Sequence, residues 1–324
     1  MKPIHRRIFV TGGIGVLAAL GTRRLVAAPM AELKSLQIVV PTPPGSQPDL
    51  IARWIVEPMA KRAGVPGIVV HRPGAAGAIA ADAVLAATPE SGALLLGGLD
   101  HVAYSHLNSE RRALDPFVDF APVGAVNRDT WLLATSAANP ARSLTALVEA
   151  SRAKGPLNFA STGEGSTAHL LSARLCRAVG IEAQHVPYKE SWLPDLIAGR
   201  IDFVVAPTPA LLGQIKGERV AALASLTNER LAMLQGVPSM RELGWPDQVF
   251  YGGLFLFAPA ALTPQAQRLN TWLAESLQQP DIAARFRDAA IEPTPVNLEQ
   301  TRQLLTERLR TVDAMRLAVF GRTR

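Results

Sequence analysis

An apolar strand turns into a helix through the stretch VVPTPPGSQPD at residues 39–49. Four prolines and one glycine keep this loop out of both flanking elements. The carboxylate of Asp49 is placed to cap a helix that begins at Leu50, with Arg53 one turn on. The loop therefore ends at a helix N-terminus, where unpaired N–H groups and the helix dipole attract anions.

The chain after this loop alternates strands and helices. Apolar runs predict strands at 36–40, 67–70 and 94–97, and a glycine corner at 71–77 leads into an alanine-rich helix at 79–87. We expect Pro58 to kink or end the helix that begins at Leu50. Such alternation is typical of a parallel sheet with helices on both faces, where ligands collect beyond the carboxyl ends of the strands.

The same scheme restarts after residue 130, which predicts two lobes with a cleft between them. Expected strands at 157–160, 183–186, 201–205 and 220–226 alternate with expected helices at 144–153, 167–179, 193–198 and 210–215. Extended crossings near 124–130 and 246–252 can absorb a hinge rotation. A return strand at 252–259 and helices at 265–278 and 298–316 are expected to complete the first lobe. The predicted domains are residues 31–125 with 249–324, and residues 126–248.

A second loop, STGEGSTAHL at residues 161–170, is the counterpart of the first in the other lobe. Its glycines let the backbone turn N–H groups inward, and Ser166 or Thr167 caps the next helix. Two such corners that face each other across a cleft can hold the two ends of one small anion.

The first 30 residues are predicted to be a signal peptide that exports the chain to the periplasm. A basic start precedes an apolar stretch at 8–20 and the small residues Ala27 and Ala28, and this stretch is short for a membrane anchor. Arg6 and Arg7 before the stretch are typical of a twin-arginine signal.

Composition excludes nucleic acid as a partner and gives no internal disulfide. The net charge of +6 includes five basic residues that precede the first acidic residue, so the mature chain carries only +1. Cys176 is the single cysteine and lies in an apolar helical segment, which favours a buried structural role.

The motifs of common catalytic and cofactor sites are missing or misplaced. The stretch TGGIGVLA at 11–18 resembles a dinucleotide fingerprint, but no strand precedes it and it lies in the leader. Ser166 and His169 lack a nucleophile elbow, and His71, His101, His106, His169 and His185 lack metal-site spacing. We therefore expect no enzyme activity, no metal and no cofactor.

An ordered set of short motifs resembles one protein family along essentially the whole mature chain. The motifs are VVP at 39–41, PG at 44–45, DLIAR at 49–53, RPGA at 72–75, LLLG at 94–97, DFAPV at 119–123, NFAS at 158–161, GEGSTAHL at 163–170, VPYK at 186–189, DL at 195–196, GRID at 199–202, VPS at 237–239 and AP at 258–259. The chain resembles the TctC/Bug family of periplasmic solute-binding proteins, the receptors of tripartite tricarboxylate transporters.

This resemblance implies a two-lobed Venus-flytrap receptor of the α/β class, each lobe a mostly parallel sheet flanked by helices. It implies a monomer that closes on a small carboxylate, amino acid or related metabolite, held largely by backbone N–H groups and water. The positions implied to face the ligand are Thr42, Pro43, Gly45, Ser46, Gln47, Asp100, His101, Ser161, Gly163, Glu164, Gly165, Ser166, Thr167 and Tyr188.

The chain departs from the family pattern near this site. Glu164 stands where the family commonly has asparagine, and Glu190 where it has glycine. Their negative charge predicts a ligand with a cationic or neutral group beside its carboxylate, unless both side chains point to solvent. Two alternatives stay open at this stage: an exported enzyme on a similar fold, and a receptor that presents its closed form to a sensor-kinase ectodomain instead of a transporter.

Overall fold

Two five-stranded sheets organise the computed structural model, which describes residues 33–103, 113–289 and 291–321 of the unit Ala31–Arg324. The predicted signal peptide lies outside the described residues. The first sheet has the order β2-β1-β3-β11-β4. Its strands are β1 (Leu36–Val40), β2 (Gly67–His71), β3 (Ala93–Gly97), β4 (Phe120–Ala125) and β11 (Phe255–Pro259).

The second sheet repeats the plan of the first. Its order is β10-β6-β9-β7-β8. Its strands are β6 (Trp131–Ser136), β7 (Leu157–Ser161), β8 (Ala183–Pro187), β9 (Phe203–Pro207) and β10 (Val220–Ser225). The strand β11 runs against its neighbours in the first sheet and β6 does so in the second, while the other strands of each sheet run in one direction. The predicted fold class of mostly parallel sheets is confirmed.

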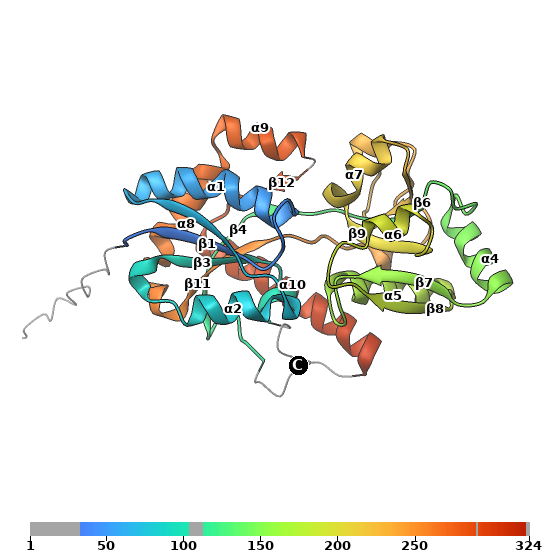
Figure 1. The fold of residues 1–324 in the computed structure, drawn as a ribbon, viewed down its shortest axis with the longest axis horizontal. Coiled ribbons are helices and arrows are strands. Elements are labelled where there is room, and N and C mark those ends of the chain that lie inside the picture. Colours follow the sequence, from blue (N-terminus) through green and yellow to red (C-terminus); the bar gives the residue numbers. More distant parts are fainter. Residues whose placement is uncertain (1–32, 104–112, 290, 322–324) are drawn as a thin grey trace, which may run out of the picture. The chain divides into compact units, whose positions relative to one another are not determined.

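Helices cover both faces of the first sheet, as its apolar strands require. Leu36, Ile38 and Val40 of β1 point into a core shared with α1 (Gln47–Ala63), α8 (Ala266–Leu277) and α9 (Pro280–Asp288). Val39 points the other way, toward α2 (Ala78–Leu85). Figure 1 shows α1 and α8 on one side of this sheet and α2 on the other.

The helix after the first loop begins earlier and runs further than the sequence predicts. Ser46, in extended conformation, is its N-cap, so Asp49 lies inside the first turn and does not cap the helix end. Pro58 lies within α1 without ending it, because Ile55 and Met59 stay buried against the sheet on either side. The helix stops at Gly64, whose φ of 70° suits glycine.

The second sheet is also covered on both faces. Residues of α4 (Leu144–Lys154) and α5 (Thr167–Val179) pack on one face, and those of α6 (Leu193–Ile197) and α7 (Thr208–Lys216) on the other. Short elements complete the description: α3 (Leu99–Val102), β5 (Asn127–Arg128) and β12 (Glu292–Pro293), the last two paired antiparallel.

The last helix, α10 (Leu298–Phe320), packs against both β4 and α5. The helix therefore contacts elements of both predicted lobes. Leu305, Leu309 and Val312 join one buried cluster that includes Phe120 of the first sheet and Phe159 of the second. This apolar face ties the two sheets together. Within the described part of the chain, no helix is both long and apolar enough to cross a membrane.

Candidate functional site

The first predicted loop is closed by hydrogen bonds among its own residues. The hydroxyls of Thr42 and Ser46 lie 2.7 Å apart, and the Ser46 hydroxyl donates to the Pro43 carbonyl at 2.7 Å. Gly45 has a φ of 81°, a backbone conformation that residues other than glycine rarely adopt. The loop thus holds one shape between the carboxyl end of β1 and the start of α1.

Asp49 anchors this loop from inside the helix. Its carboxylate accepts the N–H of Gly45 at 2.7 Å, contacts Nε2 of His71 at 2.7 Å and pairs with Arg53 at 2.9 Å. Burial acts to raise the pKa of Asp49, but the hydrogen bonds from Gly45, His71 and Arg53 outweigh it and hold the pKa below its ordinary value. Asp49 therefore stays ionised and orders the loop instead of meeting a ligand.

Gln47 connects the first loop to a crossing segment between the two sheets. Its side-chain amide donates to the buried carboxylate of Asp129 at 2.7 Å, and Asn127 donates to the same oxygen at 2.6 Å. The Asn127 amide oxygen in turn accepts the N–H of Leu254 in the other crossing, at 3.1 Å. A single network therefore joins the α1 N-terminus to both crossings.

Asp100 and His101 lie in α3, at the carboxyl end of β3. Nδ1 of His101 accepts the N–H of Gly98 at 3.1 Å and lies 3.5 Å from the Asp100 carboxylate. The His101 ring packs so closely on Gly77 that a Cβ there would come within 2.8 Å of it. The structure therefore gives His101 a packing role at the glycine corner.

The second predicted loop is also closed on itself. The hydroxyl of Ser161 accepts the N–H of Gly163 at 3.1 Å, and the Ser166 hydroxyl donates to the Gly163 carbonyl at 2.8 Å. Ser166 caps α5 by accepting the N–H of His169 at 3.3 Å, as one of the two predicted caps does. The N–H of Gly165 donates to Nδ1 of His169 at 3.0 Å.

These contacts change which backbone donors can serve a ligand. The N–H groups of Gly45, Gly163 and Gly165 are all donated within their own loops, so the glycines shape the loops and do not offer donors. First-turn N–H groups have no partner inside a helix, so those of Gln47 and Asp49 in α1 and of Thr167 and Ala168 in α5 are open donors at these two loops.

The charged and aromatic residues predicted near the second loop either contact another element or are exposed to solvent. The hydroxyl of Tyr188 donates to Asp195 at 2.6 Å, so it is engaged with α6. Glu164, Lys189 and Glu190 are exposed. In the described part of the chain, no group of three His, Cys, Asp or Glu side chains is arranged to hold a metal.

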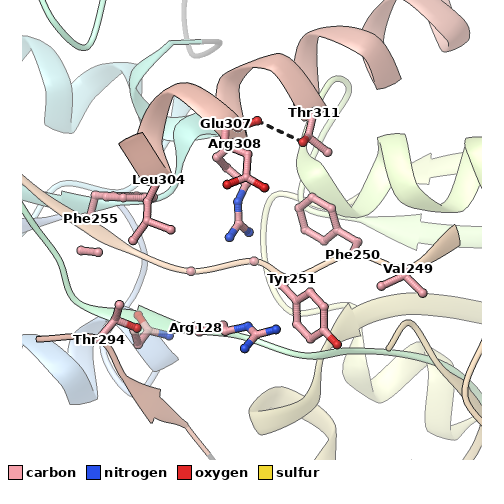
Figure 2. Close-up of a pocket in the computed structure, with 14 residues that line it drawn as sticks. Arg128, Val249, Phe250, Tyr251, Phe255, Thr294, Leu304, Glu307, Arg308 and Thr311 are labelled. Carbon is pink, nitrogen blue, oxygen red and sulfur yellow. Dashed lines mark hydrogen bonds between the residues drawn. The ribbon is translucent and has the colours of Figure 1, made fainter. Parts of the chain in front are cut away.

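A pocket of about 400 Å³ lies at the crossing segments and α10. Figure 2 shows the Arg308 side chain reaching from α10 toward the crossings, with Arg128 and Tyr251 on the opposite wall. Burial lowers the pKa of Arg308 to about 10, and its Nη1 atom is buried without a hydrogen-bond partner. None of the predicted ligand residues lines this pocket.

Sequence reasoning missed the residues that support the two loops. Asp129 is isolated in the sequence, and only the fold places it beside Gln47. The sequence suggests only two uses for these histidines, His169 as a catalytic base and both as metal ligands, yet in the fold they hydrogen-bond the second loop at Gly165 and Ser161. The position of His169 three residues after the Ser166 cap is the one local signal for its place behind the loop.

Comparison with known proteins identifies the family. The model of the tripartite tricarboxylate transporter family receptor, TctC, matches residues 51–317. The chain belongs to this receptor family. It is 30% identical to the protein BugT of Bordetella pertussis, over 91% of this chain and 93% of that protein. The TctC/Bug resemblance drawn from the motifs is confirmed, and the family is one of solute-binding receptors, not enzymes.

Solved structures agree with this assignment. MatC of Rhodopseudomonas palustris, determined with bound malate, superposes with a TM-score of 0.77 at 26% identity, covering 87% of this chain and 98% of that chain. Rpa4515 of R. palustris, determined with adipate, superposes with a TM-score of 0.79 at 26% identity, covering 87% and 96%. The TctC receptors are periplasmic binding proteins that bind small carboxylates and work with tripartite transporters.

Proposed function

We propose that this TctC receptor is exported to the periplasm, loses its signal peptide, and as a monomer captures a small carboxylate for a tripartite transporter. The ligand would lie between a lobe of residues 31–125 with 249–324 and a lobe of residues 126–248. The two-sheet plan supports this division, because no strand of one sheet enters the other. The second candidate partner is a sensor-kinase ectodomain, which would bind the closed form of the receptor.

The observation that carries the proposal is the pair of ordered loops with open first-turn N–H groups. The N–H of Gln47 begins α1, and those of Thr167 and Ala168 begin α5. Each group follows the carboxyl end of a parallel strand, the edge where ligands bind in such sheets. Helix N-termini stabilise anions through these donors and the helix dipole, so one carboxylate per loop is a chemically matched ligand.

The two solved relatives with malate and adipate make dicarboxylates the first probes. Glu164 places an exposed negative charge in the second loop, and this charge would repel a ligand with two negative charges. We therefore propose that this receptor prefers an acid with a neutral or cationic group beside its carboxylate over a tricarboxylate. Glu164→Gln would then raise the affinity for dianions such as malate, and citrate would bind more weakly than malate or an amino acid.

The test is a thermal-shift screen of the purified protein against malate, adipate, citrate, monocarboxylates and amino acids, followed by calorimetry on the hits. A ligand that binds only the folded form raises the unfolding midpoint by mass action. Recovery of the bound acid unchanged after prolonged incubation is expected of a receptor. If no compound in the panel binds, the proposed function is contradicted. If citrate is the tightest ligand, the proposed ligand preference is contradicted.

A further inference from the structure

Two imidazole rings lie face to face behind the second loop. His169 of α5 and His185 of β8 have ring centroids 3.9 Å apart and planes within 8° of parallel. Phe159 of β7 stacks against both rings, and Phe320 of α10 closes the edge of His169. Only 8% of His169 is exposed. His169 is therefore part of the packed interior, and His185 lies half-buried beside it.

Each ring holds a different atom of the loop. Nδ1 of His169 accepts the N–H of Gly165 at 3.0 Å, so this nitrogen carries no proton. Nε2 of His185 lies 2.7 Å from the hydroxyl of Ser161, which also accepts the N–H of Gly163. Histidine nitrogens thus contact the loop at both ends, at the Ser161 side chain and at the Gly165 backbone N–H.

Burial opposes protonation of both rings, and the neighbouring charges act on the two rings in opposite directions. Arg316 of α10 lies beside Gly165 and acts on His169, while the carboxylate of Glu164 in the loop acts on His185 in the opposite sense. Burial, His185 and Arg316 together lower the pKa of His169 to about 4, and burial lowers the pKa of His185 despite Glu164. A proton on Nδ1 of His169 would turn the acceptor of Gly165 into a donor that faces another donor.

We propose that His169 and His185 are positioning residues that keep the second loop competent for carboxylate binding, and that they do so only while Nδ1 of His169 carries no proton. The neutral pair fixes Ser161 and Gly165, and so sets the direction of the open N–H groups of Thr167 and Ala168. Protonation of His169 at Nδ1 releases the loop and lowers ligand affinity. This inference rests on the proposed function, but its first consequence, the protection of the Gly165 amide, needs no ligand.

Two variants separate hydrogen bonding from packing. His169→Asn keeps an acceptor near the position of Nδ1 and cannot be protonated near neutral pH, whereas His169→Phe keeps a ring but has no acceptor. We expect the hydrogen-exchange protection factor of the Gly165 amide, followed by NMR from pH 7.5 to 3, to collapse as the pH falls through about 4 in the wild type only. It should stay high in His169→Asn and be low at every pH in His169→Phe.

The second readout is the affinity for malate and adipate over the same pH range. Ligand carboxyl groups titrate equally in both experiments, so the ratio of wild-type to His169→Asn affinity isolates the imidazole. We expect this ratio to fall by up to about tenfold per pH unit as the pH drops through about 4. Parallel profiles, or full Gly165 protection in His169→Phe, would overturn the inference.

The two readouts also separate this inference from the proposed function. If neither acid binds, carboxylate capture fails for these probes, while the Gly165 protection pattern still decides the positioning role. Should His169→Phe not fold, as judged by its unfolding midpoint, the contrast between wild type and His169→Asn carries the test alone. A wild-type protection factor that does not change with pH contradicts the inference in that case.

Discussion

The side chain of Gln47 donates a 2.7 Å hydrogen bond to the carboxylate of Asp129, joining the first residue of α1 to a crossing between the two sheets. Asp129 is 5% exposed, and Asn127 donates to the same oxygen. A movement of one lobe relative to the other would have to carry this buried pair with it or break it. The ligand loop and the crossing are therefore mechanically coupled in this conformation.

Asp129 should make the protein less stable as the pH rises. Burial raises its pKa to about 6 from an ordinary 3.8, so the folded state holds the proton more tightly than the unfolded chain. Its stabilising contribution is complete below about pH 4 and is lost as the pH rises through about 6. The full effect is on the order of 3 kcal/mol.

Asp129→Asn should remove this dependence, because an amide does not titrate in this range. We expect urea unfolding to show a variant that gains stability relative to the wild type between pH 4 and 6. His169 titrates in the acid range in both proteins, so the difference between them isolates Asp129. A difference that does not change with pH would show that the carboxyl group keeps its ordinary pKa.

Gln47→Leu should destabilise the protein by about 1–2 kcal/mol at pH 7.5, because it removes a donor from a buried carboxylate. The cost should shrink at pH 4.5, where Asp129 is protonated in the folded state. In the Asp129→Asn background the same substitution should cost less than in the wild type. Equal costs at both pH values and in both backgrounds would contradict the coupling.

The crossing beside Asn127 depends on a glycine. Gly253 has a φ of 149°, and a Cβ there would overlap the Asn127 carbonyl. We expect Gly253→Ala to lower the free energy of unfolding by about 2 kcal/mol or more. The matched control is Gly213→Ala in α7, where nothing lies within 4 Å of the added Cβ and alanine should stabilise the helix by about 0.5–1 kcal/mol. Equal midpoints for both variants would refute the expectation.

The architecture follows from local patterns, and the sequence predicts it well. The predicted strand at 36–40 coincides with β1, and its signal is a run of apolar residues. The predicted helix at 167–179 coincides with α5, and its signals are helical periodicity and the Ser166 cap. Pro58 does not end α1, because burial of Ile55 and Met59 offsets one missing hydrogen bond. Tertiary packing overrides a local rule there.

The support of the candidate site could not be predicted, because it depends on residues far apart in the chain. Asp129 follows Gln47 by 82 positions, and Ser161 precedes His185 by 24. The glycine N–H groups were expected to face the ligand, but whether they are donated internally depends on the exact position of Asp49 and His169. The reach of α10 across both sheets likewise depends on the whole fold.

The central claim is that first-turn N–H groups of the helices hold the carboxylate, and one residue allows their direct removal. Thr167 is the first residue of α5, where proline is well tolerated, and Ser166 already has the extended conformation that precedes proline. Thr167→Pro therefore deletes one open donor while leaving the helix in place. Thr167→Ala removes the side chain but keeps the N–H and is the matched control.

The decisive measurement is the calorimetric affinity of these two variants for malate and adipate at pH 7.5. The account predicts that Thr167→Pro binds at least one of these acids about tenfold more weakly than Thr167→Ala, at a similar unfolding midpoint. Equal affinities in the two variants, or no binding of either acid by the wild type, would contradict it.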